Sequence, residues 1–426
     1  MVSEIFTPYK LGPITLRNRT IRSAAFEGMC PGNSPSQEIF DYHTAVSRGG
    51  IGMTTVAYAA VCRSGLSFER QLWMRPEIVP ELRKLTDAIH AEGAKASIQL
   101  GHCGNMSHRK ICGCLPYGAS TGFNLYSPTF VHRMNAAEIE QVAKAFGTAT
   151  SLAIEAGFDC VEIHAGHGYL ISQFLSPYTN HRRDEYGGSL DNRMRFMREC
   201  MKEVIDAATA PDGTRRIAVT AKINTRDGFK GGLEVDDCIE VARELRRLGV
   251  DALILSGGFV SRAPMYVMRG QFPVRAIAHY MPWKTQWWLK IGVFFGGKIV
   301  SPTVPFKPLF FMEDALKFRA AMPDFPFIYV GGVVSAQGAS EVLENGFPLF
   351  QMGRAVLEDT DFVNKMAADA NHCSGCKHIN FCIGRMYSIS MACHKTCPDI
   401  TPALKRSCRR IERQNDRMEH GARTIL

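Results

Sequence analysis

The chain has 426 residues, of which 46% are hydrophobic and 21% are charged, and its formal net charge is +9. This is the composition of a globular protein with a large core, and the lack of any run of about 20 apolar residues argues against a spanning helix. The modest positive charge suits an anionic ligand and is no nucleic-acid signature by itself. We expect a cytoplasmic protein, since the first ten residues lack the apolar core of a secretory signal.

Short β-rich runs alternate with longer helical patterns from about Thr15 to Gly353. The predicted strands are Thr20–Ser23, Ile51–Val56, Ala94–Leu100, Asp159–His164, Ile217–Ile223, Ala252–Leu255, Phe327–Val330 and Leu349–Met352. The helices predicted between them are Arg75–Glu92, Ala137–Ala156, Arg193–Ala208, Leu233–Leu248 and Ala336–Glu344. Eight strands that alternate with helices predict a (β/α)8 TIM barrel.

An open doubly wound sheet is the rival fold, and the glycines decide against it. Such a sheet would carry a glycine-rich loop after its first strand, whereas this chain has Ala24-Ala25-Phe26-Glu27-Gly28 there. The glycine-rich turns come after strands seven and eight instead, at Gly331-Gly332 and Gly353-Arg354. A barrel builds a phosphate site at these places, so backbone N–H groups of the three glycines and the Arg354 side chain are candidate phosphate ligands.

Two stretches interrupt the alternation. Residues 104–133 form a Cys-, Ser- and Pro-containing loop after strand three. Residues 262–311 form a long aromatic segment, which we interpret as a lid over the barrel mouth; a surface that touches a membrane or a partner subunit is the alternative. We expect residues 1–370 to form the barrel, with 262–311 as a lid-like insertion, and residues 371–426 to form a Cys-rich, basic extension.

Three side chains that can donate hydrogen bonds follow the fourth strand, namely His164, His167 and Tyr169. Two donors that converge on one substrate oxygen can stabilise negative charge there, as in an oxyanion hole. Tyr169 can offer a proton as a general acid. Two alternatives for the histidines are a metal pair, with Glu162 as a third ligand, and core residues with satisfied hydrogen bonds.

The same stretch carries the most specific motifs, His-x-x-His-Gly-Tyr-Leu, Gln-Phe-Leu-Ser-Pro and Asp-Glu-Tyr-Gly-Gly-Ser-x-x-Asn-Arg. Together with Leu16-Arg-Asn-Arg, Gln99-Leu-Gly-His102, Ala221-Lys-Ile-Asn, Val330-Gly-Gly and Met352-Gly-Arg, they resemble the old yellow enzyme family of FMN-dependent oxidoreductases. The resemblance covers about residues 5–370. It implies a barrel that binds FMN, takes a hydride from NADH or NADPH and reduces an activated alkene.

The resemblance also implies roles for individual residues. His164 and His167 would bind the substrate oxygen, and Tyr169 would donate the proton on the face opposite the flavin. Ala24, Ala25, Ala57, Gln99 and Lys222 would contact the flavin, and Gly331, Gly332, Gly353 and Arg354 its phosphate. Many relatives have Thr or Cys where this chain has Ala25 and Phe26, so only backbone contact is expected there. Lys222 replaces an arginine and offers a point charge in place of a planar fork.

The cysteine tail resembles the branch that holds 2,4-dienoyl-CoA reductase and trimethylamine dehydrogenase, which carry a [4Fe–4S] cluster after the barrel. The candidate ligands are Cys373, Cys376, Cys382 and Cys393. Their second spacing is two residues longer than in those relatives, so zinc and free thiols remain alternatives. The basic residues that follow, from Lys405 to Arg413, predict a solvated amphipathic helix.

Other functions stay open at this point. A flavin-dependent amine dehydrogenase of the same branch, or an electron-transfer subunit with an iron–sulfur cluster, would keep the flavin and change the chemistry. A barrel lyase or hydrolase would use the two histidines as metal ligands. The expected partners are a small-molecule substrate and either a second copy of the chain or a redox partner subunit.

Overall fold

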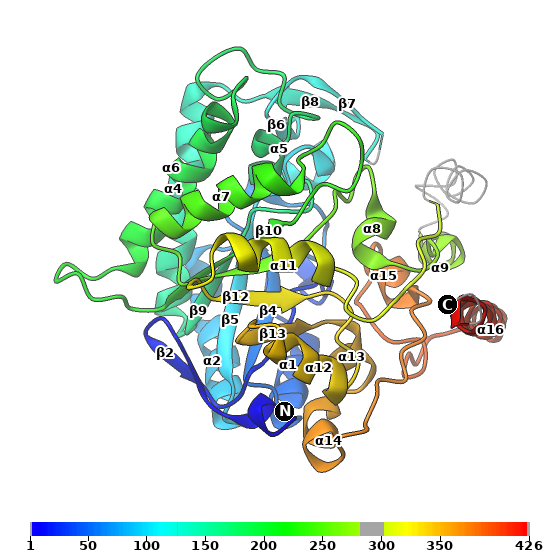
Figure 1. Cartoon of the computed structure of the whole chain (residues 1–426). Helices are drawn as coiled ribbons and strands as arrows, with labels where there is room; N and C mark the ends of the chain where they lie inside the picture. The colour runs from blue at the N-terminus through cyan, green and yellow to red at the C-terminus, as the bar shows by residue number, and fades with distance from the viewer. Residues whose placement is uncertain (1, 126, 282–301, 424–426) are drawn as a thin grey trace.

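Eight parallel strands close into a barrel in the order β10-β11-β12-β13-β3-β4-β5-β9. The computed structural model describes residues 2–125, 127–281 and 302–423 (Figure 1). All eight predicted strands are confirmed, with ends that shift by a few residues. The barrel strands are β3 (Thr20–Arg22), β4 (Met53–Ala60), β5 (Lys95–Gly101), β9 (Cys160–His164), β10 (Ala218–Asn224), β11 (Ala252–Ser256), β12 (Phe327–Val330) and β13 (Leu349–Met352).

Helices follow the strands along the chain and cover the outside of the barrel (Figure 1). The helix predicted at Ala137–Ala156 is confirmed as α4, which buries one face that includes Ile139, Phe146 and Ala153, and Asn135 and Glu138 close its first turn as a capping box. The outer helices are α1 (Gln37–Arg48), α2 (Val79–Ala91), α4 (Ala136–Glu155), α6 (Leu190–Ala208), α7 (Val235–Arg247), α11 (Met312–Ala321), α12 (Ala336–Glu344), α13 (Arg354–Glu358) and α14 (Phe362–Ala368).

Two helix starts differ from the prediction. The helix predicted from Arg75 begins only at Val79, after a 3-10 turn at Pro76–Ile78, because prolines fit the first turn of a helix better than its interior. The helix predicted from Arg193 begins earlier, at Leu190, because the Ser189 hydroxyl accepts the N–H of Asn192 as an N-cap.

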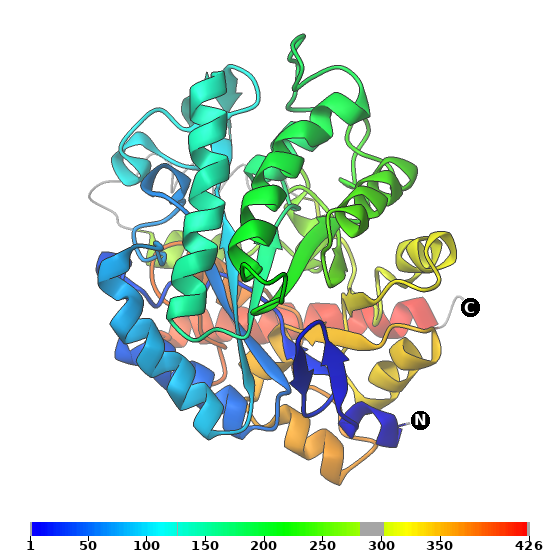
Figure 2. The same ribbon diagram turned by 90° about the vertical axis from the view of Figure 1, so that its left-hand side faces the viewer.

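An N-terminal hairpin covers one end of the barrel. Strands β1 (Tyr9–Leu11) and β2 (Ile14–Leu16) pair antiparallel, and Leu11 and Leu16 pack on the first residues of several barrel strands, such as Cys160 and Ala218. Figure 2 shows this hairpin in dark blue below the strands. The opposite end, where the strands have their carboxyl termini, is therefore the one left for a binding site.

The aromatic insertion is described only at its two ends. Helices α8 (Pro264–Met268) and α9 (Val274–Tyr280) belong to it, and Gly270 forms an antiparallel bridge with Val304. The tryptophan-rich part of the predicted lid falls on residues 282–301, which lie outside the described residues. No helix in the described ranges has the length and apolarity needed to cross a membrane.

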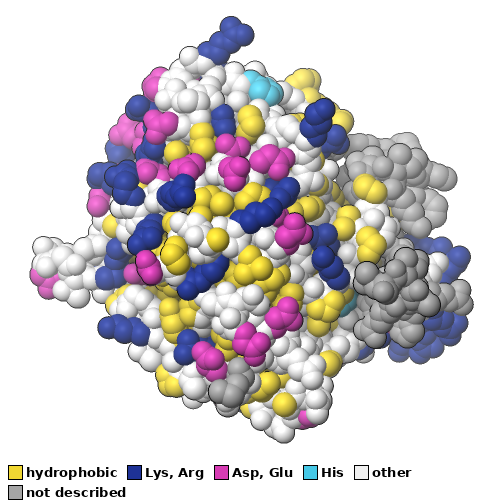
Figure 3. Space-filling view, viewed as in Figure 1, with side chains coloured by type: hydrophobic (Ala, Val, Ile, Leu, Met, Phe, Trp, Pro, Cys, Tyr) yellow, Lys and Arg dark blue, Asp and Glu magenta, His cyan; other side chains and the backbone are white. Residues whose placement is uncertain are grey.

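The C-terminal extension packs against the barrel mouth. It contains α15 (Phe381–Met386) and α16 (Pro402–Arg423), and Phe381 and Leu404 share an apolar cluster with Ala276 of α9. Figure 3 shows Lys and Arg side chains gathered at the right-hand edge, where α16 lies. Among the residues of this helix whose burial is described, the exposed cations are Lys405, Arg406, Arg409, Arg410 and Arg413.

The extension also touches the loop after β3 directly. The N–H of Met391 donates to the carbonyl of Glu27 at 2.6 Å. Gly28 has a positive φ of 66°, and a Cβ on it would lie 2.6 Å from the Ile389 carbonyl oxygen. The extension thus depends on a glycine at this position to approach the barrel.

Candidate active site

A cavity of about 260 Å³ lies at the carboxyl ends of the barrel strands. Side chains from β5, β9 and the turns after β12 and β13 form its base and sides, and the C-terminal extension adds an apolar wall. The lining includes Ser23–Phe26, Gln99, His164, His167, Tyr169, Gly331, Gly332, Gly353, Arg354, His378, Cys382, Ile383, Met386 and Met391. The residues predicted after strand four and at the phosphate turns therefore meet in one cavity.

The trio after β9 forms a compact aromatic group. The ring centroids of His164 and His167 lie 5.1 Å apart at an interplanar angle of 82°, and those of His164 and Tyr169 lie 4.2 Å apart. Tyr58 of β4 packs edge-on against Tyr169, with 5.1 Å between the centroids. Three donors, at the end of β9 and in the loop after it, thus line one small cavity.

The backbone and two neighbouring strands orient His167. Its φ is +59°, a left-handed conformation that is uncommon outside glycine. Its N–H donates to Oδ1 of Asn224 at 2.9 Å, and its Nε2 lies 2.7 Å from the Ser256 hydroxyl. These partners stand at the ends of β10 and β11, so the ring position depends on two adjacent strands, which the sequence analysis did not identify.

Both histidines are neutral at physiological pH. Burial, and next the nearby His167 and Lys222, hold the pKa of His164 well below its usual range. Burial and Lys222 lower the pKa of His167 to about 3. The N–H of Gly166 lies 3.4 Å from Nδ1 of His164, which assigns that nitrogen as the acceptor and leaves Nε2–H as the donor.

Tyr169 keeps its proton. Burial raises the pKa of its hydroxyl above the usual value, and the nearby Tyr387 and Cys103 raise it further. A protonated phenol in a buried site can donate a hydrogen bond or a proton. Because the Tyr169 hydroxyl keeps its proton, it suits the role of a general acid more than that of a base.

A buried polar network lies beneath the trio and centres on Glu162. Its carboxylate accepts from Nε2 of Gln99 at 2.6 Å and from Nε2 of Gln351 at 2.7 Å. Lys222 Nζ lies 2.8 Å from the same carboxylate. Glu162 lies two residues before His164 in β9, so the sequence places both side chains on the same face of the strand. The sequence analysis missed Gln351, although it is a polar residue within the apolar strand β13.

A second buried ion pair stands after β3. Arg22 Nη1 lies 2.6 Å from Glu27 Oε1, and both side chains are 1% exposed. The N–H of Ala57 donates to both oxygens of the Glu27 carboxylate, at 3.2 and 3.1 Å. Ala57 and Lys222 are absent from the described cavity lining, so their predicted flavin contacts remain predictions.

The turn after β13 leaves space beside a cation, whereas a Cβ on Gly331 or Gly332 after β12 would lie 2.7 Å from Phe311 or 2.9 Å from the Leu309 nitrogen. Gly331 and Gly332 have φ values of 138° and 81°, a backbone conformation that glycine adopts readily and other residues rarely do. This conformation sets the direction of their N–H groups. A Cβ on Gly353 would meet no atom within 4 Å. Arg354 donates to Oδ1 of Asn380 at 3.0 Å.

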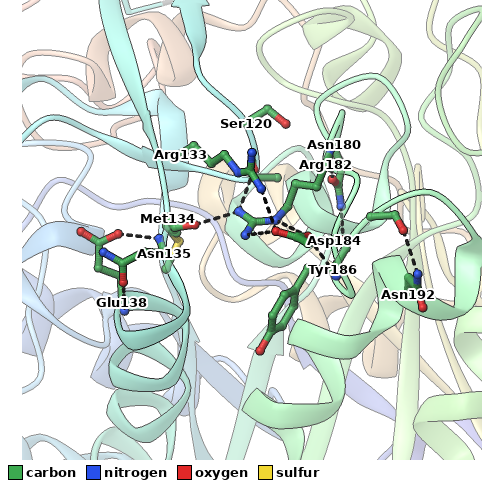
Figure 4. Close-up of polar contacts among 12 residues, drawn as sticks. Ser120, Arg133, Met134, Asn135, Glu138, Asn180, Arg182, Asp184, Tyr186 and Asn192 are labelled. Carbon is green, nitrogen blue, oxygen red and sulfur yellow. Dashed lines mark hydrogen bonds and ion pairs between the residues drawn. The ribbon is translucent and has the colours of Figure 1, made fainter.

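The polar run after β9 holds its own loop, as Figure 4 shows. Arg182 donates to both carboxylate oxygens of Asp184, at 2.9 and 2.7 Å, and to the carbonyls of Ala119 and Met134. Arg133 donates to the same carboxylate at 2.7 Å. These contacts give Arg182 and Asp184 a structural role in this loop.

His102 supports a loop and does not line the cavity among the described residues. Its Nε2 lies 3.1 Å from the Ser64 hydroxyl, and its Nδ1 accepts the N–H of Gly104 at 3.0 Å. Its carbonyl accepts the N–H of Leu170 at 2.9 Å, next to Tyr169. These contacts favour a loop-support role for His102.

Three of the four candidate cysteine ligands in the C-terminal extension lie together, and the fourth does not. Cys376, Cys382 and Cys393 line one small cavity of about 20 Å³ beside Arg354. Cys373 is exposed, and its thiol lies 3.4 Å from the Asn371 carbonyl. No group of three or more Cys, His, Asp or Glu stands ready for a metal ion within the described residues.

Comparison with known proteins assigns a family. The family model described as NADH:flavin oxidoreductase / NADH oxidase matches residues 4–287. A 4,4'-dithiodibutanoate disulfide reductase of Rhodococcus erythropolis is 38% identical over 386 residues, which cover 90% of this chain and 93% of that protein. An NADPH dehydrogenase of Listeria monocytogenes serotype 4b (strain CLIP80459) is 37% identical over 272 residues, or 62% of this chain and 76% of that protein.

A solved structure of 2-naphthoyl-CoA reductase superposes with a TM-score of 0.76 at 22% identity. The match covers 96% of this chain and 58% of the solved chain, so this chain corresponds to little more than half of that protein. The likeness shows a shared fold.

Proposed function

Because this chain belongs to the NADH:flavin oxidoreductase / NADH oxidase family, we propose that it is an FMN-dependent enzyme that reduces an electron-poor C=C bond with NADH or NADPH. The observation that carries the proposal is the meeting of His164, His167 and Tyr169 in one cavity with the glycine turns after β12 and β13. The first set suits a carbonyl-type oxygen, and the second suits a phosphate.

The residues present fit FMN. Gln99 gives its amide N–H to Glu162, so its Oε1 is left, among the described contacts, to accept from a ring N–H. Gly331, Gly332 and Gly353 offer backbone N–H groups, and Arg354 offers a cation for the phosphate. Ile383, Met386 and Met391 supply an apolar wall for the hydrocarbon edge of the ring system. When bound, FMN supplies hydride transfer between NAD(P)H and the acceptor.

The protein side chains then act on the substrate. His164 donates from Nε2 to the substrate oxygen. The Ser256 hydroxyl can donate to Nε2 of His167, which leaves Nδ1–H of that ring as the second donor. Two such donors stabilise the negative charge that develops on the oxygen, and each is worth about 3–4 kcal/mol in comparable oxyanion sites. Tyr169 gives its hydroxyl proton to the neighbouring carbon.

The described thiols do not fit a [4Fe–4S] cluster, because Cys373 stands apart from the small cavity that Cys376, Cys382 and Cys393 line. We therefore route no electron through a cluster. Iron and acid-labile sulfide, assayed in anaerobically purified protein, test this point directly. The amine dehydrogenase alternative ranks lower, because two neutral histidine donors suit an oxygen better than an ammonium ion.

Reduction of a small disulfide is a second candidate. The observation that favours it is the 38% identity, over 90% of this chain, to a protein named for that activity. A disulfide substrate has no carbonyl next to its reacting atoms for these donors to bind. Removal of the histidines should therefore slow alkene reduction more than disulfide reduction.

One experiment separates these functions. Purified protein is examined for a bound-flavin absorption spectrum and, if colourless, is titrated with FMN. NADH or NADPH oxidation is then followed with 2-cyclohexenone and with 4,4'-dithiodibutanoate. Faster turnover of the enone supports the main proposal, and faster turnover of the disulfide replaces it with the second. A protein that binds no FMN overturns both.

A further inference from the structure

Four thiols gather beside the small sheet above β5, away from the residues assigned to the flavin and the substrate. The sheet consists of β6 (Tyr117–Gly118), β7 (Gly122–Asn124) and β8 (Thr129–Arg133). Electrostatic interactions link the thiols of Cys62, Cys103, Cys112 and Cys114. None of the four lines the cavity among the described residues, so the proposed function leaves them without a role.

Cys112 and Cys114 stand on either side of a single glycine. The short helix α3 (Arg109–Cys112) ends at Gly113, whose φ of 81° is left-handed and turns the chain back sharply. The Cys112 thiol lies 3.3 Å from the carbonyls of both His108 and Cys114. The turn thus holds the Cys112 sulfur against the backbone of Cys114, two residues along the chain.

The two cysteines differ in their exposure to solvent. Cys112 is 3% exposed, whereas Cys114 is half-buried. A small molecule therefore reaches Cys114 first, and Cys112 waits behind it. This is the arrangement that an attacking and a resolving thiol need.

Cations surround the turn. A Cβ on Gly113 would lie 3.3 Å from Nε of Arg63, so that guanidinium packs directly on the turn. Arg63, Arg109 and Lys110 are all exposed. Positive charge beside a thiol stabilises the thiolate and attracts anionic molecules.

The two thiols shift each other's pKa. The Cys114 thiol, by donating to Cys112, lowers the pKa of Cys112, and the same contact raises the pKa of Cys114. The first proton is therefore lost from Cys112 more easily than from an isolated thiol.

We propose that Cys112 and Cys114 form a dithiol site that exchanges with small anionic disulfides. Cys112 takes the proton of Cys114, and the half-buried Cys114 attacks one sulfur of the disulfide as a thiolate; that S–S bond breaks, a mixed disulfide forms, and one thiolate leaves and takes a proton from water. Cys112 then loses its proton to water and attacks the mixed disulfide. A Cys112–Cys114 disulfide forms and the second thiol leaves, so two electrons pass from the protein to the small molecule.

The proposal does not rest on the proposed function, and its test needs no cofactor turnover. Full-length protein is reduced, freed of reductant and incubated at pH 7 with glutathione disulfide and without NADH or NADPH. The tryptic peptide Ile111–Arg133 contains Cys112 and Cys114 and no other cysteine. We expect mass spectrometry to find this peptide lighter by two hydrogens, without bound glutathione. An unmodified peptide, or one that keeps glutathione, overturns the proposal.

Single variants assign the two roles. Cys112→Ser is expected to trap glutathione on Cys114, and Cys114→Ser to slow the reaction of the peptide at least about tenfold, because the remaining thiol is buried. Cys62→Ser is the matched control from the same thiol group and is expected to leave disulfide formation unchanged. Loss of the disulfide in this control would assign the exchange to Cys62 and overturn the pair. If a variant fails to fold by circular dichroism, the wild-type peptide alone decides.

The preference for anions has its own control. Arg63→Gln is expected to slow the reaction with glutathione disulfide and to leave the reaction with the neutral bis(2-hydroxyethyl) disulfide unchanged. Equal rates of wild type and variant with both disulfides would overturn the anionic preference.

Discussion

The ammonium group of Lys222 lies 2.8 Å from Oε1 of Glu162, and the two side chains are 3% and 2% exposed. Burial lowers the pKa of Lys222, while Glu162 raises it again. The cation at the end of β10 is therefore offset by a carboxylate of the neighbouring strand β9. A flavin bound near this pair would therefore meet two charges that nearly cancel, in place of a free positive charge.

Breaking this pair should cost more than breaking a surface pair. Glu162→Gln leaves a buried ammonium group without its partner, so the free energy of unfolding should fall by about 3–5 kcal/mol. Urea unfolding of the flavin-free protein measures the loss. The exposed pair of Glu81 and Lys84 gives the control, and Glu81→Gln should cost less than about 1 kcal/mol. Equal losses in the two variants would contradict a buried, compensated pair.

The stability of the protein should depend on pH through His167. Its folded pKa is about 3, below the value of about 6.5 for an unfolded histidine, so the unfolded chain takes up the proton first as the pH falls. The contribution is complete above pH 6.5 and is lost as the pH falls toward 3; by pH 5 the loss is up to about 2 kcal/mol.

His167→Asn should remove that part of the pH dependence. Unfolding free energies at pH 7 and pH 5 should differ less in this variant than in the wild type. The matched control is His181→Asn, at an exposed position, which should keep the wild-type difference. An unchanged difference in His167→Asn would show that this ring does not lose a proton on folding.

Tyr169→Phe should separate the two half-reactions. Removal of a general acid typically slows its own step by about 10²–10⁴-fold. Stopped-flow measurements should find slow alkene reduction and nearly normal flavin reduction by NAD(P)H. Tyr58→Phe is a suitable control because the Tyr58 hydroxyl is bonded to Ser67 at 2.8 Å. If Tyr169→Phe slowed both half-reactions equally, the hydroxyl would not be the proton donor.

Arg354→Ala should weaken FMN binding. A hydrogen bond to a charged group contributes about 1.5–3 kcal/mol, which corresponds to a dissociation constant raised by about 10–150-fold. Fluorescence titration of the flavin-free protein measures the constant. Asn380→Ala removes the partner of Arg354 and leaves the guanidinium. If both variants lost the same affinity, Arg354 would act by holding the extension and not by contacting the phosphate.

The sequence was sufficient to predict the barrel and the donors after β9. Eight strands could be placed because each is a short apolar run between helical patterns, and the glycines at 331, 332 and 353 stand where the chain must turn. His164, His167 and Tyr169 lie within six residues, so local spacing alone brings them together.

Partners that are distant in sequence could not be predicted in this way. Ser256 follows His167 by 89 residues and Gln351 follows Glu162 by 189, and both contacts depend on barrel closure and strand register. The ion pair of Arg22 and Glu27 was missed for another reason. Both residues are charged and flank a loop, a pattern that usually marks exposed side chains.

The contact between the C-terminal extension and Gly28 bears on how this protein can be shortened. The composition changes near residue 370, which invites removal of the tail to obtain a minimal barrel. Yet Ile383, Met386 and Met391 line the same cavity as Gln99 and His164, and Met391 is bonded to the loop after β3. A gene cut at residue 370 would encode a barrel with one side of its cavity open to water. A shortened form that keeps this wall must therefore keep the tail at least to Met391.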